Sequence, residues 1–187
     1  MIRRVTKDHK QVKYALEILK LKEPSMKTQI VGSSAILPCT NSQQTMQELY
    51  KLFQRLDLWK EWSVPLHASA QYSDDNSKTL SVGTKFTQTL NLGFPVGQQV
   101  SNEQVAVNEI SENHAKIMWN KEEGGIAACH LWSFECLDSE KLEVTNVEVF
   151  HGMPIFLVKG LVSNRWNDLF EKSLSGFLDY YRKSQSL

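Results

Sequence analysis

The chain has 187 residues, of which 41% are hydrophobic and 22% are charged, so it can build a sizeable core in a single domain. Its 21 basic and 21 acidic residues cancel, which excludes the overall positive field typical of proteins that bind nucleic acid or an anionic membrane. No apolar run approaches the length of a membrane span, and three cysteines without CxxC spacing favour reduced thiols in a cytoplasmic protein.

Residues 1–27 are basic, with eight Lys or Arg against three Asp or Glu. Apolar residues recur in this segment at helical spacing: Val12, Ala15, Leu16 and Leu19. We therefore predict a helix over residues 8–22, which Pro24 ends. The favoured interpretation is a solvated extension, and the alternative is a helix that docks on the domain or on a partner. Because Pro24 precedes the first predicted strand, residues 28–187 are expected to fold without the extension.

A strand is predicted over residues 28–38, because TQIVGSSAILP is rich in strand-forming residues and ends in proline. A helix is predicted over residues 41–56, where Thr45 and Glu48 fit a capping box. One apolar stripe runs along this helix: Met46, Leu49, Tyr50, Phe53 and Leu56. We interpret the stripe as part of the core. Residues 58–65, LWKEWSVP, follow with two tryptophans three positions apart.

Six further strands are predicted over residues 66–72, 79–92, 105–110, 115–119, 126–137 and 142–152. The turns between them are short, which is typical of an antiparallel meander. Gly83 indicates a bulge or a kink in the second of these strands. A long helix over residues 156–183 ends the pattern, and its broad aromatic stripe includes Trp166, Phe170 and Phe177.

Four short motifs occur in order along the chain: WKEWSVP, VGTKF, ISENHAKIMW and HLWSFECLDSEKLEVTNVEVFHG. This ordered set, spread over residues 28–183, resembles the SRPBCC superfamily of START-like lipid-binding domains, birch-pollen-allergen-like proteins and polyketide cyclases. The resemblance implies an α+β helix-grip fold: a long curved antiparallel sheet wrapped around a long C-terminal helix, with a hydrophobic cavity between them. Residues 1–27 would be a basic N-terminal helical extension and residues 28–187 the START-like domain. Because one fold hosts carriers, sensors and enzymes, the resemblance specifies the fold better than the function.

A histidine and a glutamate stand in rows that are otherwise mostly apolar. Alternate residues of a strand share a face, and the two rows are His130, Trp132 and Phe134 on one strand and Asn146, Glu148 and Phe150 on the next. A helix-grip fold implies that both rows face the concave side of the sheet. The paired residues must then have numbers with an even sum, so the loop around 138–141 must contain an odd number of residues. The histidine and the glutamate would either orient a ligand or bond to each other.

Three functions stay open at this point. The first, which we favour, is binding or carriage of a small hydrophobic ligand, such as a lipid or a polyketide, in the cavity. The ligand-binding residues would be Trp62, Phe86, Trp119, His130, Trp132, Phe134, Glu148, Phe150, Trp166 and Phe170. The second is an enzyme of the polyketide cyclase or aromatase kind, with Glu148 as general base and His130 as general acid. The third is a protein-interaction module that contacts a partner through the N-terminal helix.

No metal ion or cofactor is expected, and no catalytic residue matches a position that the resemblance specifies. His9, His67, His114 and His151 lack the spacing of metal ligands. The sequence also lacks HExxH, CxxC, the GxxxxGK phosphate loop and the GxSxG nucleophile motif.

Overall fold

The computed structural model describes residues 1–74, 79–94 and 96–186. The elements follow one another as β1 (Ile2–Arg4), α1 (Lys10–Ile18), β2 (Thr28–Pro38), α2 (Ser42–Phe53), the 3-10 helix η1 (Leu56–Leu58), α3 (Trp59–Trp62), β3 (His67–Tyr72), β4 (Lys85–Gly93), β5 (Gly97–Ile110), β6 (His114–Glu123), β7 (Ile126–Asp138), β8 (Lys141–Gly152) and α4 (Met153–Ser184). No helix within the described ranges combines the length and the apolar character needed to cross a membrane.

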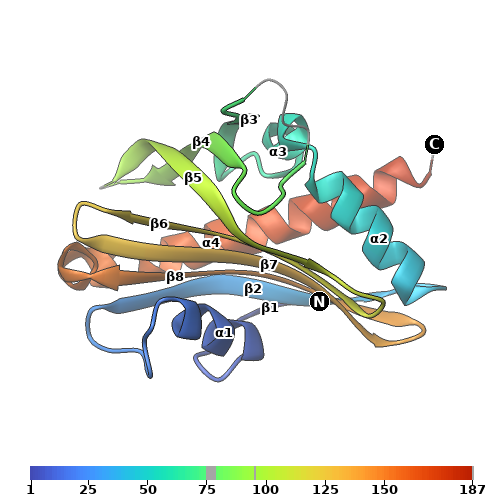
Figure 1. Cartoon of the computed structure of the whole chain (residues 1–187), viewed down its shortest axis with the longest axis horizontal. Helices are drawn as coiled ribbons and strands as arrows, with labels where there is room; N and C mark the ends of the chain where they lie inside the picture. The colour runs from blue at the N-terminus through green and yellow to red at the C-terminus, as the bar shows by residue number, and fades with distance from the viewer. Residues whose placement is uncertain (75–78, 95, 187) are drawn as a thin grey trace.

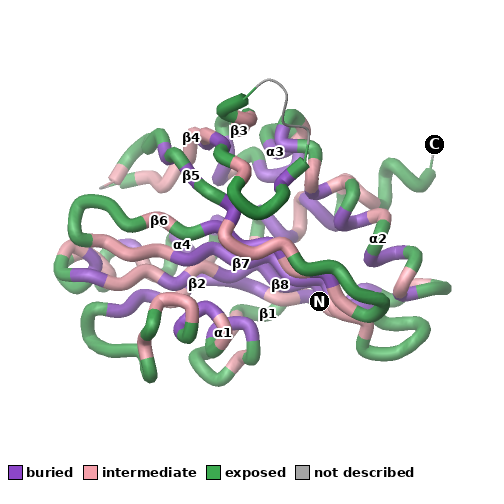
Figure 2. Tube along the Cα trace, in the orientation of Figure 1, coloured by how far each residue is buried: buried purple, intermediate pink, exposed green. Residues whose placement is uncertain are grey.

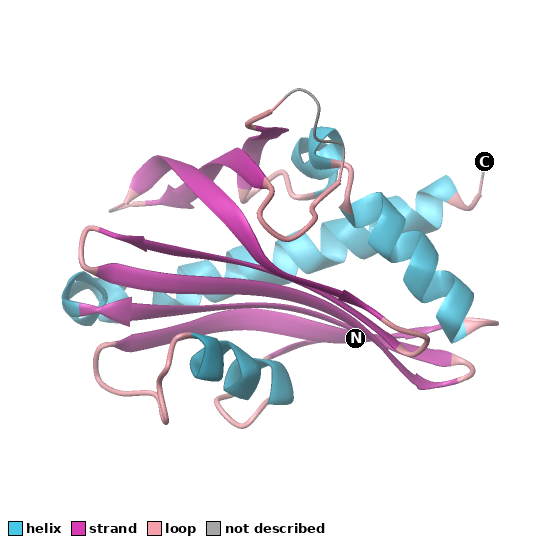
Figure 3. Ribbon diagram, in the orientation of Figure 1, coloured by secondary structure: helices cyan, strands magenta, loops and turns pink. Residues whose placement is uncertain are grey.

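The strands form one antiparallel sheet in the order β1-β2-β8-β7-β6-β5-β4-β3. The meander from β3 to β8 was predicted, and β2 extends the sheet beyond β8 by pairing with it. The long helix α4 runs along one face of the sheet and α1 lies on the other, while α2 crosses near one end (Figures 1 and 3). The sheet with its C-terminal helix confirms the predicted α+β architecture.

The hairpin of β7 and β8 has the predicted parity. His130 pairs with Glu148 and Trp132 pairs with Asn146, so the two residue numbers of each pair have an even sum. A β-bulge between Cys136 and 138 inserts the extra residue that this register requires. Both rows therefore lie on the concave face, which α2, α3 and α4 cover.

Aromatic side chains fill one end of the concave face. Phe53 of α2 is at the centre, with ring centroids 4.9 Å from Trp132 and 5.0 Å from Trp59. Phe177 of α4 packs 4.9 Å from Trp62. All of these rings are at most 3% exposed, and Figure 2 shows buried stretches along β2, β7 and β8 and within α2 and α3. Burial of such large side chains contributes the main stabilising free energy of this end.

The first helix packs on the convex face of the sheet. Val12, Ala15 and Leu16 are at most 4% exposed and cover a set of buried sheet residues. That set is Met118, Cys129, Leu131, Val147 and Val149. The favoured expectation of a solvated extension is therefore wrong, because α1 covers the apolar residues on the convex side of β6, β7 and β8. Whether residues 28–187 fold alone stays a prediction.

Charged contacts add to this packing. Lys10 lies 2.7 Å from a carboxylate oxygen of Glu135 and 3.2 Å from one of Glu143. Arg4 of β1 lies 2.5 Å from Asp168 on α4 and also bonds to Glu171. The basic N-terminal segment is thus paired with acidic residues of the body, which explains the charge asymmetry along the chain.

Several element boundaries differ from the predictions. The helix α2 begins after Asn41, whose side chain accepts a hydrogen bond from the backbone of Gln44 at 3.0 Å, so Thr45 is not its cap. Strand β4 begins at Lys85, and Gly83 lies outside it in a turn with φ +89°. Strand β5 begins eight residues before the predicted strand over 105–110. The prediction missed its first half because that half is polar on both faces.

Candidate functional site

All ten predicted site residues lie on the concave side, but they divide into two groups. Five belong to the closed aromatic cluster at the α2 end: Trp62, Phe86, Trp119, Trp132 and Phe134. Each of these five is at most 3% exposed, and their rings contact one another and Phe53. This group holds the sheet to the helices.

The second group lies toward the start of α4. Phe150 of β8 and Trp166 of α4 have ring centroids 5.0 Å apart. His130 joins the two groups, because its ring lies 4.4 Å from that of Trp119 and 5.2 Å from that of Phe170. The apolar residues around this second group include buried ones, such as Val31 and Val162, and partly buried ones: Leu90, Leu92, Val96, Ile126 and Val158. The partly buried residues mark the more exposed side of this group.

The ring of His130 is held in one orientation by Asn146. Its Nε2 lies 2.7 Å from Oδ1 of Asn146, an acceptor, so Nε2 carries the hydrogen. Nδ1 is then the free lone pair, and it faces Oε2 of Glu148 at 3.5 Å. Burial lowers the pKa of His130 to about 3, so the ring is neutral at neutral pH.

Glu148 is the accessible polar group on this face, with 15% of its side chain exposed. Burial, and then the nearby carboxylate of Glu103, raise the pKa of Glu148 well above its ordinary value. Its nearest side-chain partner in the described part of the chain is His130, and the 3.5 Å separation is long for a hydrogen bond. Glu148 is thus a largely buried carboxyl group on the concave face, with His130 beside it and no short hydrogen bond to a side chain of the described ranges.

A second buried polar chain was not predicted. It starts at α4, where Ser173 and Ser63 have hydroxyl oxygens 2.7 Å apart, and it continues from Ser63 to Nδ1 of His67 at 2.8 Å. Nε2 of His67 lies 2.9 Å from Oε1 of Gln88, whose amide nitrogen lies 3.3 Å from Glu103. This series of polar side chains runs from α4 across the concave face to β5. It ends at Glu103, whose carboxylate raises the pKa of Glu148.

His67 was not predicted to line the concave side, yet it is only 3% exposed. The register shifts between His67 and Ser69, so a β-bulge turns the histidine inward. Glu103 was missed because the strand was predicted to start two residues later. Ser101, Glu103 and Val105 alternate along β5. This alternation is the sequence signal that would have indicated an inward carboxylate.

Three buried N–H groups on the concave side have no hydrogen-bond partner among the described residues. They are Nε1 of Trp62, Nδ2 of Asn146 and Nε1 of Trp166. An unpaired buried donor costs about 1–3 kcal/mol, so each is a place where an acceptor would be favourable. No cluster of three or more His, Cys, Asp or Glu with the geometry of a metal site occurs in the described ranges.

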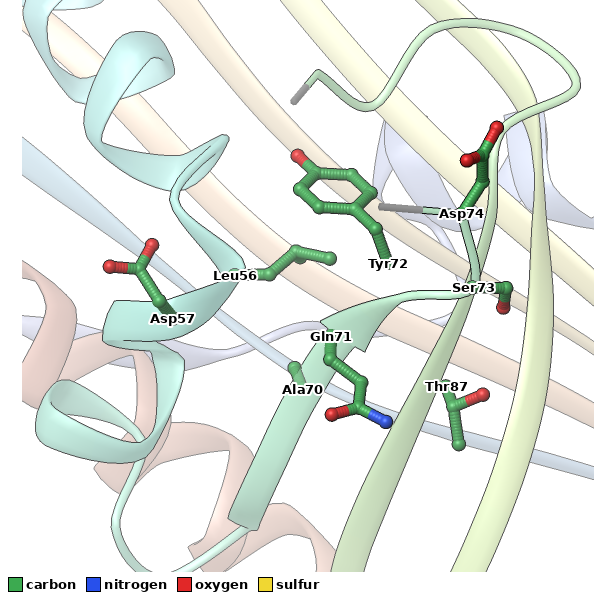
Figure 4. A pocket seen from close by; sticks show the side chains of 8 residues that line it. All are labelled: Leu56, Asp57, Ala70, Gln71, Tyr72, Ser73, Asp74 and Thr87. Atoms are coloured by element: carbon green, nitrogen blue, oxygen red, sulfur yellow. The ribbon is translucent and has the colours of Figure 1, made fainter. Parts of the chain in front are cut away.

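Hollows occur at three places on the described surface, and the one beside β5 and β6 is lined in part by Glu103 and Lys121. One of about 600 Å³ opens between η1 and β3, where Leu56 and Tyr72 face each other above Gln71 and Thr87 (Figure 4). Others of about 460 and 420 Å³ lie beside β5 and β6 and beside α1. None of the ten predicted site residues lines them. A ligand cavity between the sheet and α4 therefore stays a prediction.

The buried histidines predict a specific pH dependence of stability. Burial lowers the pKa of His67 to about 4, whereas the unfolded chain takes up this proton near pH 6.5. The free energy of unfolding should therefore fall as the pH decreases from about 6.5 to 4. In His67→Gln that slope should be smaller by up to about 1.4 kcal/mol per pH unit, measured by urea unfolding across this range.

The buried carboxyls change the free energy of unfolding with pH in the opposite direction. Comparing His67→Gln with the parent isolates the contribution of the histidine, because both proteins contain these carboxyls. The raised pKa of Glu148 and Glu103 means that the folded state binds more protons, so their contribution falls as the pH rises above about 4.5. Equal slopes in the parent and in His67→Gln between pH 6.5 and 4 would contradict the burial of a neutral histidine.

Comparisons with known proteins agree with this architecture. A protein from Helicobacter pylori of no assigned function superposes with a TM-score of 0.66 at 16% identity, covering 81% of this chain and 86% of that one. Human STARD10 gives 0.57 at 10% identity, covering 98% and 85%. Norcoclaurine synthase from Thalictrum flavum, in complex with dopamine and hydroxybenzaldehyde, gives 0.56 at 13% identity, covering 84% and 89%.

Neither the protein-family models nor the curated proteins gave a match to the sequence. At these identities the structural similarities establish the fold and leave the activity open. The eight-stranded sheet, the covering helix α4 and these three superpositions together show the helix-grip fold that the sequence's resemblance to the SRPBCC superfamily implied.

Proposed function

We propose that the protein binds a small hydrophobic molecule between the sheet and the first half of α4, with Glu148 and His130 orienting its polar group. The observation that carries this proposal is Glu148 itself. Its carboxyl is 15% exposed on the concave face, and its contact with the side chain of His130 is 3.5 Å long. A group in this position is destabilising in the free protein and gains a partner when a ligand arrives.

The surrounding residues suit an apolar ligand body. Phe150, Trp166 and Phe170 form one wall, and the partly buried Leu90 and Leu92 face them from β4. Apolar surface removed from water contributes about 25 cal/mol per Å², so a ligand that buries 200 Å² would gain about 5 kcal/mol before entropic losses. Complexes of the same fold with small aromatic molecules, such as norcoclaurine synthase with dopamine and hydroxybenzaldehyde, support this use of the face.

The test uses the apolar fluorophore N-phenyl-1-naphthylamine, which is expected to bind the protein and to quench its tryptophan emission. Glu148→Gln keeps the shape of the side chain and removes its ability to ionise. It should change the affinity for polar competitors of the fluorophore by about fivefold or more, because a hydrogen bond to a charged or acidic group contributes about 1.5–3 kcal/mol. Competitor affinity is read from fluorophore displacement.

Glu122→Gln is the matched control, because Glu122 is exposed on β6 of the same sheet. It should leave both the fluorophore and its competitors unaffected. Absence of fluorophore binding by the parent protein would refute the binding function. Unchanged competitor affinity in Glu148→Gln would refute the orienting role of the carboxyl.

The second candidate function is acid–base catalysis, and the contact between His130 and Glu148 favours it. A neutral imidazole with a free lone pair beside a carboxyl of raised pKa forms a pair that can accept and return one proton. The third hypothesis, an interaction module, needs an exposed apolar surface on the N-terminal helix. That surface is not exposed, since Val12 and Leu16 are buried on the sheet. Turnover of a bound polyketide analogue that disappears in both His130→Asn and Glu148→Gln would favour the enzyme.

A further inference from the structure

Two buried N–H groups on this part of the concave side lack a hydrogen-bond acceptor. Nε1 of Trp166 and Nδ2 of Asn146 are buried N–H groups with no acceptor among the described residues. Trp166 is 4% exposed and Asn146 is fully buried. The one amide oxygen of Asn146 already receives the N–H of His130 at 2.7 Å. Two donors in this part of the interior are therefore unpaired, whereas the acceptors of the concave face, Nδ1 of His130 and the carboxyl of Glu148, face each other at 3.5 Å.

Trp166 and Glu148 lie on two elements that enclose this part of the interior, α4 and β8. Trp166 packs on Phe150, with ring centroids 5.0 Å apart. Phe150 follows Glu148 by two residues on β8 and so lies on the same concave face. A ligand bound between β8 and the first half of α4, as proposed, would lie beside both Glu148 and Trp166.

From this geometry we infer that the polar group of the ligand is a hydrogen-bond acceptor, a carbonyl or carboxyl oxygen, to which the indole N–H of Trp166 donates. The inference rests on the proposed function and names the ligand class of the same site: an apolar body that ends in a ketone, an ester or a carboxylic acid. The raised pKa of Glu148 agrees with this class, because a carboxyl that keeps its proton is a further donor.

A cationic amine fits the site poorly. It would need ionised Glu148, yet it would meet the N–H groups of Trp166 and Asn146, which offer it no acceptor. The cation Lys121 is already close, held by Glu123 at 2.5 Å and by the hydroxyl of Ser101 at 3.1 Å. Like charge there disfavours a second ammonium group.

The experiment compares ligands of matched length in the displacement of N-phenyl-1-naphthylamine: methyl laurate, dodecanoic acid and dodecylamine. Methyl laurate and dodecanoic acid should displace the fluorophore at concentrations at least about tenfold below those of dodecylamine. Trp166→Phe keeps an aromatic ring and removes the donor. It should weaken methyl laurate by about fivefold more than it weakens the fluorophore, which has no carbonyl oxygen to accept the bond.

Trp62→Phe is the matched control, because Trp62 also has an unpaired, buried Nε1 but lies in the closed aromatic cluster. It should not change the affinity of any of the three ligands. A second measurement needs no substitution: the indole proton resonance of Trp166 should move downfield when methyl laurate binds, and that of Trp62 should stay in place.

Each result decides the inference. Tighter binding of dodecylamine, or equal affinity for methyl laurate in the parent and in Trp166→Phe together with an unmoved Trp166 resonance, would overturn the acceptor class. In both cases the fluorophore would still bind, so the proposed function would survive. If the fluorophore does not bind the parent protein, the proposed function fails and the inference fails with it.

Discussion

Removal of residues 1–25 is expected to lower the free energy of unfolding by about 4 kcal/mol or more, a large part of the roughly 5–15 kcal/mol typical of a folded domain. Val12 and Leu16 lose their burial, at about 2 kcal/mol each, and Leu131 and Val147 become exposed to water. The measurement is urea or thermal unfolding of the truncated chain. An unchanged transition would instead support the sequence-based expectation that residues 28–187 are an independent domain.

Point substitutions in α1 separate packing from chain length. Leu16→Ala should cost about 2–5 kcal/mol, because it leaves a cavity against the convex face. Lys13→Ala, on the exposed side of the same helix, should change stability by less than about 0.5 kcal/mol. Similar effects of the two substitutions would show that α1 is not docked as the structure places it.

Gly176→Ala is expected to destabilise the protein by about 1–3 kcal/mol or more, although alanine is the better helix former. A Cβ at Gly176 would lie 1.9 Å from the carbonyl oxygen of Trp62, so α4 and α3 would have to separate. Their separation would also break the contact between Ser63 and Ser173, whose oxygens are 2.7 Å apart. Thermal unfolding of the variant measures the effect.

The same helix offers the control. Gly160 is exposed, and a Cβ there meets no atom within 4 Å, so Gly160→Ala should raise stability by up to about 1 kcal/mol. The two substitutions are chemically identical and should have opposite signs. Two stabilising results would mean that α4 does not approach the end of α3 closely.

The concave rows could be predicted because alternation in a strand is a local property. His130 and Glu148 each stand two residues from an aromatic side chain, and the parity of the hairpin then fixed their common face. The motif order predicted the helix-grip architecture, since each strand and helix has its own periodicity. The distance between His130 and Glu148 required the register, which depends on the bulge after Cys136.

The features that were missed depend on contacts between distant parts of the chain. The strand β1 has only three residues, and it is a strand because it pairs with Ser33 to Ala35 of β2. The docking of α1 depends on uncovered apolar residues more than one hundred positions later. The inward turn of His67 follows from a single bulge, and a one-residue shift sends every later side chain of a strand to the other face.

The pairing of β2 with β8 has a consequence for the order of events during synthesis. Thr28 pairs with His151, 123 positions later, so β2 leaves the ribosome long before its partner exists. At about 5–20 residues per second the interval is about 6–25 seconds. During that time α1 also lacks the convex face on which it docks. The first segment to emerge is therefore among the last to reach its native contacts, and the long loop that β2 and β8 close makes slow folding the expected behaviour.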